Sequence, residues 1–215
     1  MTPSRFDLAA ATWDEHPARI ALTKAIAEAI LDQVPVTAAM TALDFGCGTG
    51  LVTLALQPYV QRIIGVDSSP GMLAKLREKM QALGITNVET RLLDLTIQPP
   101  PPGLCAELIV SAMVLHHIDD LPTILQYLTR MLVPGGYLAL ADLDTEDGSF
   151  HPDPTGVYHA GIDRHWLSNQ LIALGFTDVR ATTVHVIERP DAEGTPRQYP
   201  IFLVSGHYIH ERSKL

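Results

Sequence analysis

The strongest constraint on the fold of this chain is the stretch "LDFGCGTG" at residues 43–50. It places Asp44, Gly46, Gly48 and Gly50 at alternate positions directly after a short apolar run. Glycines here let the backbone turn sharply from a buried strand into a helix, and they let backbone N–H groups approach a ligand closely. The stretch therefore predicts an α/β fold with a nucleotide-type ligand at the end of its first strand.

The glycine spacing separates the possible nucleotides. A dinucleotide site has the pattern G-x-G-x-x-G, whereas this chain has D-x-G-x-G-x-G and carries Leu51 where the third glycine of that pattern belongs. No P-loop lysine follows the glycines, which disfavours phosphate transfer. An NAD-dependent oxidoreductase on the same sheet architecture is thus an alternative that the spacing disfavours.

Helix and strand periodicities alternate along the chain. Strands are predicted at residues 41–45, 62–67, 88–93, 106–115 and 137–143, and helices at 20–34, 50–56, 70–83 and 121–132. The strands are continuous apolar runs, typical of parallel strands with helices on both faces. Ser69 and Pro70 mark the start of the third predicted helix, Gly84 its end, and the tripeptide PGG at 134–136 ends the fourth.

The pattern changes after residue 143. It predicts a loop at 144–162, a helix at 166–174, and two strands at 178–187 and 201–209 joined by a loop at 188–200. No linker, internal repeat or second apolar core interrupts the 215 residues. We therefore predict one domain over residues 1–215, with a helical N-terminal segment at 1–36 and a core at 37–215.

The composition of the chain indicates which classes of partner it does not bind. The net charge is −9, from 15 basic and 24 acidic residues, which disfavours a nucleic-acid partner. The apolar run at 108–115 is too short to span a bilayer, and the N-terminus lacks the features of a signal peptide, so we expect a cytoplasmic protein without a membrane partner. Cys47 and Cys105 show no disulfide or metal-ligand pattern, and both are predicted to be buried.

Two acidic residues narrow the choice of ligand. Asp67 ends the second predicted strand, where a carboxylate can accept hydrogen bonds from both ribose hydroxyls of a bound adenosine. That position fits NAD and adenosyl ligands equally well. Asp44 favours the adenosyl ligand, because its carboxylate would repel a pyrophosphate but would attract the cationic amino group of a methionine moiety.

Five stretches in this order resemble a family: "LDFGCGTG", "IIGVDSSPGML", "RLLDL", "LIVSAMVLHHIDD" and "LVPGGYLALADL". Together they resemble the class I S-adenosylmethionine-dependent methyltransferases of the small-molecule type, over most of residues 41–143. The resemblance implies a Rossmann-like, doubly wound, seven-stranded and mostly parallel sheet with an antiparallel last strand. It also implies S-adenosyl-L-methionine as the cofactor.

The resemblance implies roles for individual residues. The glycine loop would lie under the methionine part, Asp67 would hold the ribose, Asp94 would accept from the adenine amino group with Leu95 behind the ring, and Ser111 would lie near the methionine carboxylate or sulfonium. The full predicted cofactor set is Trp13, Asp44, Gly46, Cys47, Gly48, Gly50, Asp67, Ser68, Met72, Asp94, Leu95 and Ser111. From the residues alone, Asp94 fits a cap of the turn before Thr96 as well.

Histidines mark the second half of the predicted site. Eight of the nine follow residue 115, and His116 and His117 come directly after the fourth predicted strand, where similar methyltransferases often carry a histidine. We name His117, His151 and His159 as candidate catalytic residues. His116 or His117 could instead pack under the next helix. The spacing matches no compact metal motif, so no metal is predicted, and Asp163 is read as a helix N-cap.

The predicted activity is in-line transfer of a methyl group from S-adenosylmethionine to an unidentified small molecule. The segment "FDLAAATWDEHP" resembles the lid of similar enzymes, in which Trp13 would cover the cofactor or the acceptor; Trp13 could also simply dock the first helix. The fourth strand lacks the N/D-P-P-Y/F signature of DNA base methylation. A non-catalytic adenosylmethionine-binding regulatory module is the alternative from another class.

Overall fold

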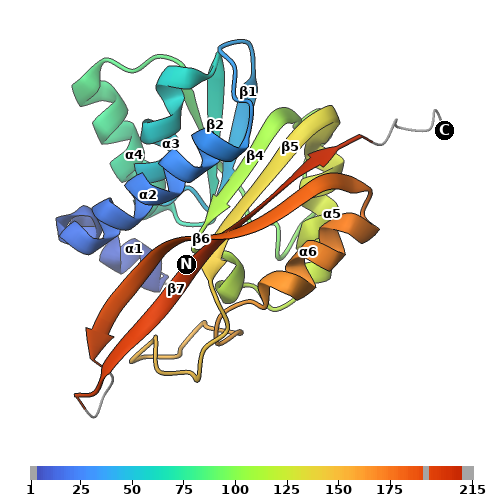
Figure 1. The fold of residues 1–215 in the computed structure, drawn as a ribbon. Helices are drawn as coiled ribbons and strands as arrows, with labels where there is room; N and C mark the ends of the chain where they lie inside the picture. Colours follow the sequence, from blue (N-terminus) through green and yellow to red (C-terminus); the bar gives the residue numbers. More distant parts are fainter. Residues whose placement is uncertain (1–3, 191–193, 210–215) are drawn as a thin grey trace.

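The computed structural model describes residues 4–190 and 194–209, and a seven-stranded sheet forms its centre (Figure 1). The strand order is β3-β2-β1-β4-β5-β7-β6. The strands are β1 (Thr41–Phe45), β2 (Arg62–Asp67), β3 (Val88–Leu92), β4 (Ala106–Ala112), β5 (Leu132–Leu143), β6 (Phe176–Pro190) and β7 (Pro196–Tyr208). The first five pair in parallel, and β7 runs antiparallel to both of its neighbours. The predicted fold class is confirmed.

Helices cover both faces of the sheet (Figure 1). They are α2 (Pro17–Gln33), α3 (Leu51–Leu56), α4 (Pro70–Leu83), α5 (Leu121–Met131) and α6 (Arg164–Ala173). On one face α5 and α6 bury Leu125, Leu128 and Leu171 against β1, β4 and β5. On the other face α2 and α3 bury Ile26, Ile30 and Leu56. This two-sided burial explains why the central strands read as continuous apolar runs.

The helix ends follow the sequence signals. Ser69 accepts a hydrogen bond from the N–H of Met72 at the start of α4, and Gly84 ends that helix in the left-handed conformation. Asp163 caps α6 through the N–H groups of His165 and Trp166. These caps satisfy N–H groups that have no partner inside the helix, and all three predictions are confirmed.

Four expectations were wrong in detail. β4 ends at Ala112, because residues 115–117 form a 3₁₀ turn. The tripeptide PGG lies in an irregular stretch of β5, between the pairs Ala106–Leu132 and Leu108–Tyr137. The predicted loop at 188–200 is largely strand, because pairs such as Glu188–Gln198 extend the β6–β7 ladder in spite of their polarity. Cys105 is exposed, since it precedes β4 instead of lying in it.

No helix among the described residues is long and apolar enough to cross a membrane. The domain boundaries predicted at residues 1–36 and 37–215 stay a prediction.

Candidate functional site

The glycine loop joins β1 to α3, and all three of its glycines have positive φ, at 72°, 54° and 83° for Gly46, Gly48 and Gly50. A Cβ on Gly46 would lie 2.4 Å from the Val114 side chain, and one on Gly50 would lie 2.3 Å from Leu76. A Cβ on Gly48 would meet only the Met72 sulfur among the described residues, at 4.0 Å. Packing against Val114 and Leu76 therefore requires glycine at positions 46 and 50. Gly48 instead leaves space in which a ligand can approach the backbone.

Asp67 ties the glycine loop to the start of α4. Its carboxylate accepts hydrogen bonds from the N–H of Gly48 at 2.7 Å and of Ser69 at 2.8 Å. Burial raises the pKa of Asp67 above its usual value, although these two N–H groups act in the opposite direction. A carboxylate has about four acceptor positions, so Asp67 keeps acceptor capacity for a ligand beside Gly48. The exposed Ser68 follows it directly.

Asp44 lies in the interior beneath the glycine loop. Its side chain is 1% exposed and accepts a hydrogen bond from the Thr53 hydroxyl at 2.5 Å. Burial raises the pKa of Asp44 to about 7, because the charged form has lost its hydration. A cationic group bound nearby would return the carboxylate to its charged form.

The other predicted cofactor residues occupy the same edge of the sheet in different ways. Asp94 accepts from the N–H and the hydroxyl of Thr96, at 2.9 and 2.6 Å, so it does cap that turn. Leu95 is buried beside it. The hydroxyl of Ser111 is buried and donates to the Phe45 carbonyl at 2.8 Å, which directs it into the sheet. Burial raises the pKa of the Cys47 thiol well above its usual value, which makes it a poor nucleophile.

A short N-terminal helix, α1 (Arg5–Ala9), crosses this edge and contacts three separate parts of it. Arg5 donates to the carbonyl of Thr155. The Phe6 ring lies 5.3 Å from the ring of His117, edge to face. Asp7 accepts from the Ser69 hydroxyl at 2.6 Å and from the Gly71 N–H at 2.9 Å.

The contacts of α1 and of the 3₁₀ segment η1 (Ala10–Glu15) fix the N-terminal segment over the glycine loop. Asp14 accepts from the Thr49 hydroxyl at 2.6 Å and from the Lys79 ammonium at 2.7 Å. Trp13 stacks under the guanidinium of Arg19, at 4.0 Å, and lies 6.1 Å from Phe6. The segment therefore lies against the glycine loop, and Trp13 packs against Arg19 within it; its role in covering the cofactor or the acceptor stays a prediction.

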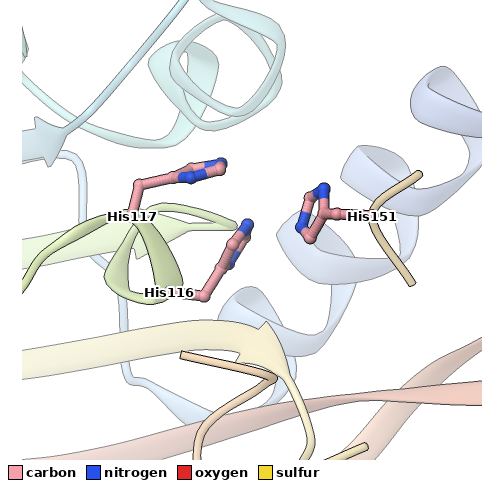
Figure 2. Close-up of side chains that lie close together, drawn as sticks. All are labelled: His116, His117 and His151. Carbon is pink, nitrogen blue, oxygen red and sulfur yellow. The ribbon is translucent and has the colours of Figure 1, made fainter. Parts of the chain in front are cut away.

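Three histidines gather beside the end of β4 (Figure 2). His116 and His117 belong to the 3₁₀ turn η3 (Leu115–His117), and His151 comes from the loop after β5. The ring centroids are 4.0 Å apart for His116 and His117, 5.0 Å for His116 and His151, and 5.6 Å for His117 and His151. The 3₁₀ turn lets the adjacent side chains of His116 and His117 lie close together, because adjacent residues of a β-strand would point to opposite faces of the sheet.

A buried carboxylate orients the first of these histidines. Asp142 is 0% exposed, and its oxygen lies 2.5 Å from Nδ1 of His116. It also accepts from the N–H groups of Leu115 and Leu143, both at 2.7 Å. Burial alone raises the pKa of Asp142, but His116 and these hydrogen bonds outweigh burial and hold the pKa below its usual value. Asp142 is thus a charged acceptor for His116.

The other two histidines are neutral at pH 7. Nδ1 of His117 lies 2.8 Å from the carbonyl of Gly156. Burial, followed by the neighbouring His116, lowers the pKa of both His117 and His151 to about 4. Within the described part of the chain, the buried Nε2 of His151 has no hydrogen-bond partner.

His159 does not join this cluster. Its Nε2 donates to the Ile118 carbonyl at 2.8 Å, and its own N–H donates to the carbonyl of His116 at 3.3 Å. These bonds fasten the 144–162 loop to the turn after β4. The candidate catalytic role of His159 thus lacks the geometry that His117 and His151 have.

Sequence reasoning missed two features of the site. The His116–Asp142 pair joins two residues 26 positions apart, and neither residue was among the candidates. Met113, just after β4, has φ of 59°, an uncommon conformation for a residue with a side chain, which often marks a functional edge. No local pattern signals either feature; the only available sign was that both lie at strand ends.

Comparison with known proteins agrees with this geometry. Residues 42–136 match the family model described as a methyltransferase domain. An uncharacterized methyltransferase of Schizosaccharomyces pombe is 35% identical over 135 residues, which are 57% of this chain and 48% of that protein. A trans-aconitate 2-methyltransferase of Methylobacterium nodulans is 35% identical over 124 residues, 57% of this chain and 45% of that protein.

The fold extends the similarity over nearly the whole chain. The solved structure of a SAM-dependent methyltransferase from Aquifex aeolicus superposes with a TM-score of 0.68, at 22% identity, and covers 94% of this chain and 98% of that one. The chain spans about half the length of the curated relatives it matches.

The raised pKa of Asp44 predicts how cofactor affinity depends on pH. Below about pH 7 the unliganded protein holds a proton on Asp44, and binding beside a cationic amino group must release it. We expect the dissociation constant for S-adenosylmethionine to rise about tenfold for each pH unit below 7 and to rise again above about pH 8, where the amino group of the ligand loses its proton. Calorimetric titration between pH 5 and 9 measures this.

The matched control for that titration is Asp44→Asn. It should bind more weakly at pH 8 and lose this part of the pH dependence. Burial raises the pKa of Asp67 as well, so any pH dependence that remains in Asp44→Asn is assigned to Asp67. An unchanged slope in Asp44→Asn would assign the effect to Asp67 and refute the role given to Asp44.

The contacts of Asp7 predict a loosened cover in Asp7→Ala. The change removes the acceptor of the Ser69 and Gly71 hydrogen bonds, so we expect the cofactor to dissociate about five- to tenfold faster. The melting temperature should shift by less than about 3 °C, since α1 contains no buried residue. Stopped-flow measurement with the exposed Asp32→Ala as control tests this, and equal rates in both variants would contradict it.

Proposed function

We propose that this chain, of which residues 42–136 match the methyltransferase-domain family, is a class I S-adenosylmethionine-dependent methyltransferase and transfers the methyl group of this cofactor to a small-molecule acceptor. The observation that carries the proposal is the position of Gly48 beside Asp67, with Asp44 buried behind them. This arrangement offers backbone space, a ribose acceptor and a carboxylate for a cation at one strand end.

Each part of the cofactor would meet a different strand end. The ribose would bind to the free acceptor positions of Asp67, and the methionine part would lie along the glycine loop near Asp44. The adenine would reach the end of β3, where Asp94 keeps one carboxylate oxygen beyond its bonds to Thr96. These assignments are supported by the parallel register, which brings the ends of β1, β2 and β3 to the same edge.

Methyl transfer requires few catalytic groups from the protein. Methyl transfer from a sulfonium is an in-line displacement with a good leaving group, so catalysis depends mainly on placing the acceptor, and placement can lower the barrier by several kcal/mol. The groups on the acceptor side would be His117 and His151. They are supported by their position next to β4 and by the contact of Phe6 with His117.

Charge and size favour a small acceptor. The net charge of −9 opposes binding to nucleic acid. One relative is named for methylation of trans-aconitate, which is a small molecule. We propose that residues 1–36 act as the lid of one domain over 1–215, and that the protein works in the cytoplasm.

Methyl transfer predicts a measurable product and a dependence on Asp67. The purified chain, given methyl-labelled S-adenosylmethionine and a metabolite extract, should transfer label to a compound of low molecular mass. Asp67→Ala should weaken cofactor binding by more than about tenfold, because the ribose loses its acceptor. Isothermal titration and chromatography of the labelled extract provide the two measurements.

The same experiment distinguishes the alternatives. A regulatory module would bind the cofactor without transferring label to any compound. Tight binding of NADH with no binding of S-adenosylmethionine would show an oxidoreductase instead. Unchanged affinity in Asp67→Ala would show that the ribose lies elsewhere.

The acceptor-side histidines predict a split between turnover and binding. His117→Ala should lower kcat by about tenfold or more and leave the dissociation constant of the cofactor within about twofold, because His117 lies beyond the glycine loop. His165→Ala, an exposed change on α6, is the control and should alter neither value. Equal losses of kcat and cofactor affinity in His117→Ala would make His117 a structural residue.

A further inference from the structure

We propose that His116, His117 and His151 bind a divalent transition-metal ion, with Zn²⁺ as the best fit, and leave one coordination position open. This site goes beyond the proposed methyl transfer, because binding of the ion is measurable without any transfer. It also differs from the sequence-based expectation, in which the spacing of the histidines indicated no metal.

The three histidine side chains converge on one point. Each of the three side chains offers a ring nitrogen, and these atoms lie within 4.8 Å of one another (Figure 2). A tetrahedral Zn²⁺ with ligands at about 2.1 Å holds its nitrogens roughly 3.4 Å apart. Small rotations of the rings would therefore close the site. The 144–162 loop supplies His151, whereas the other two ligands are fixed at the end of β4.

Hydrogen bonds fix the tautomers of His116 and His117. A carbonyl oxygen only accepts, so Nδ1 of His117 must donate its proton to Gly156, and the lone pair of the neutral ring is on Nε2. Asp142 likewise accepts a hydrogen bond from Nδ1–H of His116, which leaves Nε2 as the nitrogen of that ring that can ligate a metal. Two of the three rings are thus already held in the form that ligates a metal.

One ring nitrogen of His151, the buried Nε2, lacks a hydrogen-bond partner among the described residues. Buried polar atoms normally have a partner, and an unpaired one calls for an explanation such as a missing ion. Each of the three side chains offers a ring nitrogen within 4.8 Å of the other two, so an ion held between them would give Nε2 of His151 the partner that it lacks.

The surroundings resemble those of known metal centres. Metal-bound histidines commonly donate their second N–H to a carboxylate or a backbone carbonyl, which is the arrangement of Asp142 behind His116 and Gly156 behind His117. Asp142 supplies a negative charge behind His116 and favours a cation at this site, whereas the positive charges of Arg5 and Arg189 act on His151 in the opposite direction.

The ligand type selects the metal. Three imidazoles without thiolates suit Zn²⁺ and its neighbours in the transition series and do not suit Mg²⁺ or Ca²⁺, which prefer oxygen. Three protein ligands plus an open position is the usual form of a catalytic zinc site. The open position would take water or an oxygen or sulfur atom of the acceptor, whose proton the ion would make easier to remove.

The test is direct titration of the tag-free protein with Zn²⁺ and with Co²⁺, whose visible absorption reports tetrahedral nitrogen coordination. We expect a single tight site per chain and a rise in melting temperature on addition of Zn²⁺. His151→Ala should weaken binding about a hundredfold or more and abolish the Co²⁺ spectrum. This variant changes a loop residue, so its fold can be verified by its melting curve without metal.

Two further variants complete the test. His165→Ala, on the exposed face of α6, should bind Zn²⁺ like the unaltered protein. Asp142→Asn should weaken binding about ten- to hundredfold, because an amide orients His116 without charge. Equal affinity in His151→Ala and His165→Ala, or failure of the unaltered protein to bind Zn²⁺, would overturn the proposal. Either result would leave the methyl-transfer assay unaffected, since that assay is read independently.

Discussion

The parallel pairing of β2, β1, β4 and β5 brings their carboxyl ends to one edge, and the candidate site depends on this alignment. The register pairs Asp44 of β1 with Gly65 of β2 and with Val110 of β4. Each strand therefore ends within reach of its neighbour's loop. The N–H groups of Gly46 and Cys47 fix the alignment locally by donating to the Val66 carbonyl, at 2.8 and 3.0 Å. Residues that are far apart in the sequence are therefore brought together at this edge by the sheet itself.

Two buried carboxyl groups at this edge show how neighbours decide charge. Asp44 and Asp142 are both almost fully buried, and burial alone raises the pKa of each. Asp44 has little beyond the Thr53 hydroxyl to oppose burial, so its pKa rises to about 7. Asp142 has His116 and several N–H donors, so its pKa stays below the usual value. Asp44 would become charged when a ligand brings a cation beside it, whereas Asp142 already lies against the imidazole of His116.

The part of the site that could be predicted from the sequence is the part with local patterns. The glycine spacing, the strand-ending Asp67 and the cap at Ser69 each lie within a few residues of a strand end, and backbone sterics tie such residues to one geometry. The lid role of the N-terminal segment and the covering of a ligand by Trp13 stay predictions; the structure shows that the Trp13 ring packs against Arg19.

The part that could not be predicted depends on long-range contacts. His116 and His151 are brought together by a loop whose path is set by the hydrogen bonds of His159 and Tyr158 to the turn after β4. The sequence separation of His116 and His151 therefore gives no sign that their side chains lie close together. Cys105 and the irregular stretch of β5 were missed for a related reason, since hydropathy alone does not show where a strand begins or bulges.

The order of consecutive residues in α1 links the cofactor side of the site to the acceptor side. Phe6 contacts His117, and the next residue, Asp7, binds the start of α4 beside Asp67. Because these two residues are adjacent in one short helix, a movement of α1 as a unit would break both contacts. A cofactor bound next to Asp67 and an acceptor bound next to His117 would both be enclosed by the same closing movement, which also excludes water from the reacting atoms.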